Sequence, residues 1–202
     1  MQMPKLSRVL ILIASALLGI VLLLPLWRIR LVAPQYPEGL GMSIRPSTVV
    51  GLKPHDLDNI NSLNHYIGMR AIDPGTIPEL RFMPWIIVAL ATCGVAVAAM
   101  GRRSPVVAWL ISFAALGVAG IFDFWRWGYD YGHNIDVDHA IIKIPGMTYQ
   151  PPLIGTKQLL NFTATSLPDV GGILLGIAFV LGIVAMFVAV RSTQRIPILV
   201  SK

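Results

Sequence analysis

The sequence predicts an all-α integral membrane protein with four transmembrane helices and an extracytoplasmic cap formed by two long loops. Of its 202 residues, 55% are apolar and only 13% are charged, and the mean hydropathy is +0.69. In soluble domains about a quarter of the residues are charged, so this composition indicates a chain that lies in a lipid bilayer. Four apolar runs of nearly the length that a bilayer requires supply the predicted helices.

Residues 1–27 contain the N-terminus and the first predicted helix. The apolar run from Val9 to Trp27 follows Lys5 and Arg8, as the apolar run of a signal peptide would. No small-x-small cleavage site follows the run, and it is about long enough to span the hydrocarbon layer. We therefore expect a first helix that is not cleaved.

Residues 84–124 contain the second and third predicted helices, and residues 170–202 contain the fourth helix and a cytoplasmic tail. Only residues 101–104 separate the second helix from the third, so these two helices must form an antiparallel hairpin. The fourth helix contains small residues that permit close packing between helices, namely Gly171, Gly172, Gly176 and Gly182.

The basic residues predict the orientation of the chain in the membrane. Cytoplasmic segments of membrane proteins hold an excess of Lys and Arg. The residues that share one predicted side are Lys5, Arg8, Arg102, Arg103, Arg191, Arg195 and Lys202, whereas all acidic residues, from Glu38 to Asp169, lie on or beside the other side. Both termini are therefore expected in the cytoplasm. The net charge of +6 then reflects topology, and we expect no nucleic-acid partner.

The first loop, residues 28–83, is predicted to begin extended and to contain one short helix. Prolines interrupt residues 33–39 repeatedly and exclude regular helix there. From Asp56, apolar residues recur at helical spacing with polar residues between them. This pattern predicts a short amphipathic helix that ends at Gly68, with Leu63 and Ile67 buried.

The second loop, residues 125–169, opens with Trp125, Trp127, Tyr129 and Tyr131. Alternating Trp and Tyr are typical of an aromatic belt at a membrane interface. The rest of the loop is rich in turn-forming residues but too apolar to be disordered. We therefore expect the two loops to fold together into a small cap.

A copper site is one hypothesis for this cap. His65 and Met69 are four residues apart on the predicted helix, so they would share one face. Imidazole and thioether groups together suit Cu(I). Further ligands could come from His133, His139 or Met147. The alternative is that histidines lie in these loops because they are polar, and that methionines fill gaps beneath them.

A quinol site is a second hypothesis, and it involves Asp123, Arg126 and His133. An acid at the membrane edge, with aromatic residues and a histidine nearby, could hold a quinol headgroup and accept its proton. The alternative is a plain aromatic belt in which Asp123 pairs with Arg126 at helical spacing. A purely structural scaffold subunit, which requires no site, remains a third interpretation.

Four strings of the sequence resemble a known family. They are residues 33–41 (APQYPEGLG), 63–69 (LNHYIGM), 77–80 (IPEL) and 144–155 (IPGMTYQPPLIG). They resemble NosB, the small polytopic membrane proteins encoded beside clade II nitrous oxide reductases. The resemblance implies a non-enzymatic accessory protein of the bacterial inner membrane, with nitrous oxide reductase or its maturation machinery as the partner. It also implies a periplasmic copper context, in which the loops could handle Cu(I).

Overall fold

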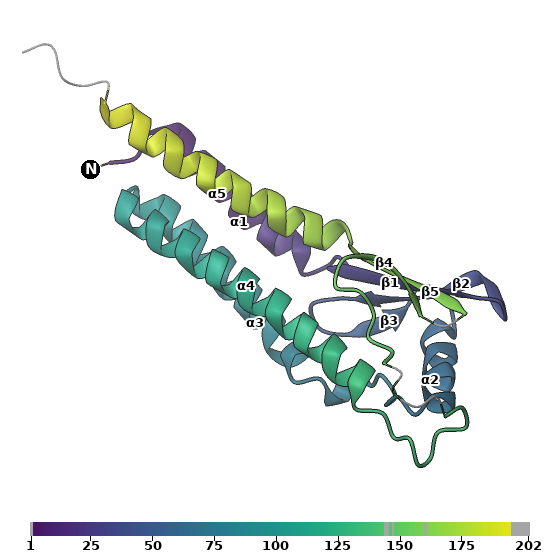
Figure 1. Ribbon diagram of the computed structural model, residues 1–202. Helices are drawn as coiled ribbons and strands as arrows, with labels where there is room; N and C mark the ends of the chain where they lie inside the picture. Colours follow the sequence, from purple (N-terminus) through teal and green to yellow (C-terminus); the bar gives the residue numbers. More distant parts are fainter. Residues whose placement is uncertain (1, 144–145, 147, 160, 195–202) are drawn as a thin grey trace, which may run out of the picture.

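The computed structural model describes residues 2–143, 146, 148–159 and 161–194, and it places the long helices at one end and a β-sheet at the other (Figure 1). The long helices are α1 (Lys5–Val21), α3 (Glu79–Met100), α4 (Arg103–His133) and α5 (Val170–Gln194). Helix α1 contacts α3 and α5, and α4 contacts the same two helices. Helices α3 and α4 form the predicted hairpin.

Three helices, α3, α4 and α5, are long and apolar enough to cross a membrane. Helix α1 has only 17 residues, fewer than the ~20 that usually span the hydrocarbon core. The prediction of four transmembrane helices is therefore wrong for the described part of the chain. The run does not stay helical to Trp27, because the chain turns after Val21 and Pro25 cannot donate a helical hydrogen bond.

The long helices are held together by a hydrogen bond from Trp109 and by close approaches at small residues. The indole Nε1–H of Trp109 on α4 donates to the carbonyl of Leu90 on α3 at 2.9 Å. A Cβ atom on Gly182 of α5 would lie 2.8 Å from the Trp109 ring, and one on Gly172 would lie 2.4 Å from the backbone carbonyl of Leu26. Gly176 has no heavy atom within 4 Å of such a position. The prediction of close packing between helices thus holds for Gly182, whereas Gly172 lies against the segment between α1 and β1 and Gly176 makes no such approach.

The five strands form one antiparallel sheet in the order β3-β2-β1-β5-β4, so the prediction of an all-α fold is wrong. The strands are β1 (Trp27–Ala33), β2 (Tyr36–Ile44), β3 (Val49–Gly51), β4 (Gly155–Leu159) and β5 (Phe162–Pro168). Strand β1 comes from the first loop and pairs along its length with β5 from the second. This pairing agrees with the expectation that the two loops fold together.

Strand β1 has a sequence pattern that explains its structure. Ile29 and Ala33 are buried, Leu31 is half-buried, and the intervening Arg28 and Arg30 are exposed. This alternation gives a strand with one face on the core and one face in solvent. The apolar face of β1 lies on the side of the sheet that α2 (Asp56–Tyr66) covers.

Helix α2 confirms the predicted amphipathic helix of the first loop. Its first residue, Asp56, is buried, and its Oδ2 accepts hydrogen bonds from the backbone N–H groups of Gly41 (2.9 Å) and Lys53 (3.2 Å). Ile60 is fully buried, whereas Leu63 and Ile67 are half-buried rather than buried. We refer to the five strands together with α2 as the sheet domain.

The sheet domain joins the long helices without a linker. Strand β5 ends at Pro168 and α5 begins at Val170, with Asp169 between them. Both carboxylate oxygens of Asp169 accept hydrogen bonds from the guanidinium of Arg28 on β1, each at 3.0 Å. The Asp169 N–H also donates to the carbonyl of Leu26. The sheet is therefore held at a defined position on the helix ends.

The basic residues that predict the cytoplasmic side, as far as the structure describes them, gather at the end of the helices opposite the sheet. The Met3 N–H donates to the carbonyl of Gly101 in the α3–α4 turn, and Arg8 Nε donates to the carbonyl of Ala98. The N-terminus thus lies beside Arg102 and Arg103, and the end of α5 with Arg191 lies at the same end of the molecule (Figure 1). Arg195 and Lys202 are outside the described residues.

Candidate functional site

The sheet domain contains an apolar cavity of about 380 Å³. It lies between one face of the sheet, helix α2, the C-terminal part of α4 and the second loop. The sheet contributes Ile29, Leu31, Leu40 and Met42 among the lining side chains. Because alternate residues of a strand point to opposite faces, the apolar residues of β1 and β2 form one continuous wall.

Helix α4 closes the cavity with two aromatic side chains. The helix does not end near Phe124 as predicted but continues to His133, so residues 125–133 are helical rather than part of a loop. Trp127 and Tyr131 lie one turn apart, face the cavity, and have ring centroids 4.3 Å apart. The predicted aromatic belt therefore divides: Trp127 and Tyr131 pack on the sheet domain, whereas Trp125 and Tyr129 are exposed.

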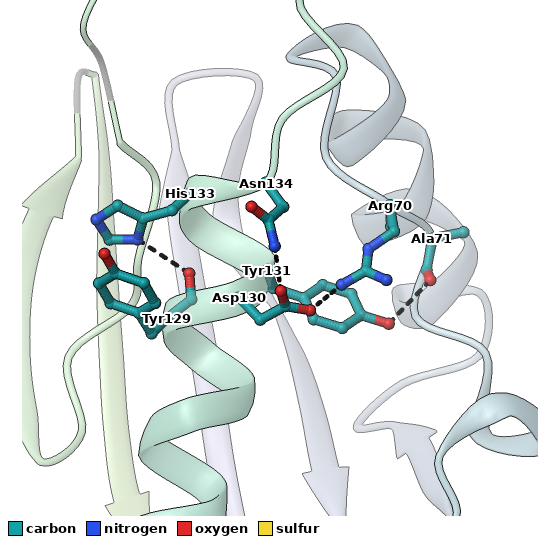
Figure 2. Close-up of polar contacts among 7 residues, drawn as sticks. All are labelled: Arg70, Ala71, Tyr129, Asp130, Tyr131, His133 and Asn134. Carbon is teal, nitrogen blue, oxygen red and sulfur yellow. Dashed lines mark hydrogen bonds and ion pairs between the residues drawn. The ribbon is translucent and has the colours of Figure 1, made fainter.

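Polar contacts hold the end of α4 against the first loop (Figure 2). Arg70 forms an ion pair with Asp130, and its guanidinium lies over the Tyr131 ring, 5.0 Å from the centroid. The Tyr131 hydroxyl donates to the carbonyl of Ala71 at 3.2 Å. Asn134 also donates to Asp130. These contacts fix the Tyr131 ring as part of the cavity wall.

The second loop supplies another part of the wall. The Tyr149 N–H donates to the carbonyl of Gly132 at the end of α4, and the Ile142 N–H donates to the carbonyl of Tyr66 at the end of α2. A Cβ atom on Gly132 would lie 2.4 Å from the backbone of Gln150. Only glycine permits this approach, which brings Tyr149 and Pro151 onto the cavity.

Trp127 and Tyr149 in the lining each carry a hydrogen-bond donor that is unpaired among the described residues. The Nε1–H of Trp127 is buried and has no acceptor within that part of the chain. Tyr149 is buried, and no partner for its hydroxyl group is found among the same residues. Burial raises the pKa of Tyr149 above its usual value, because the phenolate would lose its solvation. Tyr149 therefore stays protonated and able to donate.

The residues of the quinol hypothesis do not form a common site. Arg126 pairs with Asp123 at 2.8 Å and with Glu79 of α3 at 3.3 Å, so the expected ion pair is present. His133 is ten residues beyond Asp123, which corresponds to roughly 15 Å along a helix. Its Nδ1 donates to the carbonyl of Tyr129 at 2.9 Å, and its ring stacks on the Tyr129 ring (Figure 2).

The geometry assumed for the copper hypothesis is also absent. Helix α2 ends at Tyr66, and Gly68 has a φ of 75°, so Met69 does not follow His65 on one helix face. His65 is exposed, whereas Met69 packs in the apolar core of the sheet domain.

Of the other proposed copper ligands, those that the structure describes contact residues other than His65. His139 is exposed and contacts Asp136, and Met147 lies outside the described residues. Within the described ranges no group of three or more His, Cys, Asp or Glu could hold a metal ion. Copper ligation by these side chains thus stays a prediction that this geometry does not support.

Sequence reasoning missed the cavity itself. The sequence places Trp127 and Tyr131 in an interfacial aromatic belt, but their contact with the sheet depends on the pairing of β1 with β5, which no local pattern reveals. The one available signal was the alternation in β1. Neither protein-family models nor curated proteins match this chain.

Proposed function

We propose that this protein is a membrane-anchored accessory protein that presents its sheet domain to a partner on the periplasmic side of a bacterial inner membrane. The observation that carries the proposal is the direct joining of the sheet to the helix ends, through Asp169, Arg28 and Leu26. A domain attached in this way keeps one position and orientation relative to the helices, as a docking or scaffolding subunit requires.

The charge distribution supports the periplasmic side. Lys5, Arg8, Arg102, Arg103 and Arg191 lie at the end of the helices that is opposite the sheet. Cytoplasmic segments carry the excess of Lys and Arg in membrane proteins. An orientation with this basic end in the cytoplasm places the sheet domain in the periplasm.

The resemblance to NosB suggests the partner, which is nitrous oxide reductase or its maturation machinery. In this role the protein is not an enzyme, and its contribution is to hold or position the partner at the membrane. Handling of Cu(I) is a further part of the proposal that comes from the resemblance alone, since His65 and Met69 lie in different surroundings.

Co-purification tests this function. The tagged full chain is isolated in mild detergent from a bacterium that respires nitrous oxide, with an unrelated tagged membrane protein of similar size as the control. We expect the reductase or a maturation protein to be enriched only with this chain. We also expect deletion of its gene to lower the copper content or activity of the reductase. No enrichment, together with a fully active reductase in the deletion strain, would contradict the proposal.

A further inference from the structure

The cavity of the sheet domain has the size and lining of a small-molecule site. Pockets that hold small ligands measure roughly 300–1,000 Å³ and are mostly apolar, with a few polar groups that orient the ligand. The cavity measures about 380 Å³, and its walls come from the sheet, α2, α4 and the second loop. Most of its lining side chains are aliphatic or aromatic, so its occupant must itself be largely apolar.

Among the polar side chains of the lining, Trp127 and Tyr149 indicate what else the occupant carries. The indole N–H of Trp127 can only donate a hydrogen bond, and the protonated hydroxyl of Tyr149 can donate one. Neither has an acceptor in the described parts of the chain. The Trp127 N–H is fully buried, and buried donors without acceptors are rare and unfavourable. A ligand oxygen of the carbonyl type would give these donors the partner that they lack.

The position of the cavity indicates where such a molecule comes from. Trp127 lies 24 residues after the first residue of α4, which is about 36 Å along the helix. The hydrocarbon core of a bilayer is roughly 30 Å thick. If α4 crosses the bilayer, the cavity lies within a few ångströms of the lipid headgroups. Apolar molecules dissolved in the membrane are therefore the nearest source of an occupant.

We propose that the cavity binds one membrane-derived apolar molecule through a carbonyl oxygen, with Trp127 and Tyr149 as hydrogen-bond donors. Two sources share this chemistry, a quinone ring and the carbonyl end of an acyl chain. The site is separate from Asp123, Arg126 and His133, none of which lines the cavity. The proposal does not depend on the identity of the protein partner.

Native mass spectrometry of the full chain tests the proposal. The protein is released from detergent micelles after incubation with decylubiquinone in one arm and with palmitic acid in the other. Wild-type protein should bind one molecule per chain in at least one arm, and the arm that binds identifies the source. The variant Trp127→Phe with Tyr149→Phe keeps the aromatic rings and removes both donors, so its dissociation constant should rise about tenfold.

Trp125→Phe is the matched control, because Trp125 lies two residues away on α4, is exposed and does not line the cavity. It should bind as the wild type does. Absence of one-to-one binding by wild-type protein in both arms would overturn the proposal without requiring any variant. Equal affinity of the double variant and the Trp125→Phe control would overturn it as well.

Discussion

Two buried carboxylates, Asp56 and Asp169, connect parts of the chain that are distant in sequence. Asp56 joins the start of α2 to strand β2 through the N–H of Gly41, and Asp169 joins the start of α5 to β1 through Arg28. Removal of one partner from a buried hydrogen bond leaves the other unsatisfied, which costs more than the bond contributes. Asp56 therefore holds α2 against the sheet, and Asp169 holds the sheet against the start of α5.

Asp56→Ala should lower the free energy of unfolding by about 2–4 kcal/mol, because the N–H groups of Gly41 and Lys53 lose their common acceptor. Asp58→Ala on the same helix is the control. Asp58 is exposed and its carboxylate pairs with the exposed His55, so its loss should change stability by less than about 1 kcal/mol. Chemical denaturation in detergent measures both values. Equal destabilisation by the two substitutions would contradict the role of Asp56.

Asp169 should make the protein sensitive to acid. Its hydrogen bonds with Arg28 hold the pKa of the carboxyl group below its usual value. The stabilisation is therefore complete above the pKa of an unfolded aspartate, about 4, and is lost as pH falls through the lower pKa of the folded state. Asp169→Asn should unfold about 1 kcal/mol more easily at pH 7, where the half-exposed Arg28 is partly screened by water.

Thermal unfolding between pH 7 and pH 3 checks the Asp169 prediction. Asp169→Asn should lose less stability on acidification than the wild type does. Asp138→Asn is the control, because Asp138 is an exposed carboxylate of the second loop, and it should keep the wild-type pH dependence. The prediction is wrong if Asp169→Asn and wild type lose stability equally.

At the scale of the elements, the first turn of α5 lies in close contact with the segment that leads into β1. Gly172 faces the backbone carbonyl of Leu26 at a distance that leaves no space for a side chain. Gly171 approaches Pro25 in the same way, and its N–H donates to the Pro25 carbonyl. The direction in which the chain leaves strand β5 and enters α5 thus depends on two adjacent glycines.

Gly172→Ala should destabilise the protein by about 1–3 kcal/mol, because the new Cβ atom would lie 2.4 Å from the Leu26 oxygen and the backbone must move. Gly176→Ala, four residues later on the same helix, meets no heavy atom within 4 Å. It should be neutral or slightly stabilising, since alanine favours the helix. Thermal unfolding of the two variants in one detergent gives the comparison. Gly172→Ala as stable as Gly176→Ala would exclude this close contact.

The elements differ in how far the sequence predicts them. Helices α3, α4 and α5 follow from composition, and α2 follows from its amphipathic spacing, because both signals are local. The alternation of Ile29, Leu31 and Ala33 with two arginines could have identified β1, but its pairing with β5 joins residues more than 130 positions apart. The cavity depends on that pairing, so the candidate site could be predicted only through individual members such as Trp127.

At the scale of the whole molecule, the basic end and the sheet domain lie at opposite ends of the helices. In a Cys93→Ser background, cysteines at Ser47 and Thr163 in the sheet domain should react with a membrane-impermeant thiol reagent in intact spheroplasts. A cysteine at Ser104 beside the α3–α4 turn should react only after lysis, because positively charged turns stay in the cytoplasm. Labelling of Ser104→Cys alone before lysis would show that the chain has the opposite orientation.

The cavity and the shape of the sheet domain both depend on one feature, the sheet that joins the two loops through β1 and β5. Val32 and Thr163 are direct partners on these strands, and Gln158 of β4 lies opposite Thr163 on its other side. The Val32–Thr163 pair is within reach of a disulfide bond, whereas Val32 and Gln158 are two strands, about 10 Å, apart. The two cysteine pairs therefore differ in distance, because only the first pair joins strands that are neighbours in the sheet.

Cross-linking in membranes tests this feature most directly. Val32→Cys is combined with Thr163→Cys, or with Gln158→Cys as the control, in the Cys93→Ser background, and a protease site is placed in the α3–α4 turn. After mild oxidation and cleavage, we expect the two halves of the Val32–Thr163 variant to remain linked on a non-reducing gel and those of the control to separate. Separation of the Val32–Thr163 halves, or equal linkage of both variants, would contradict the sheet on which the cavity and the proposed function rest.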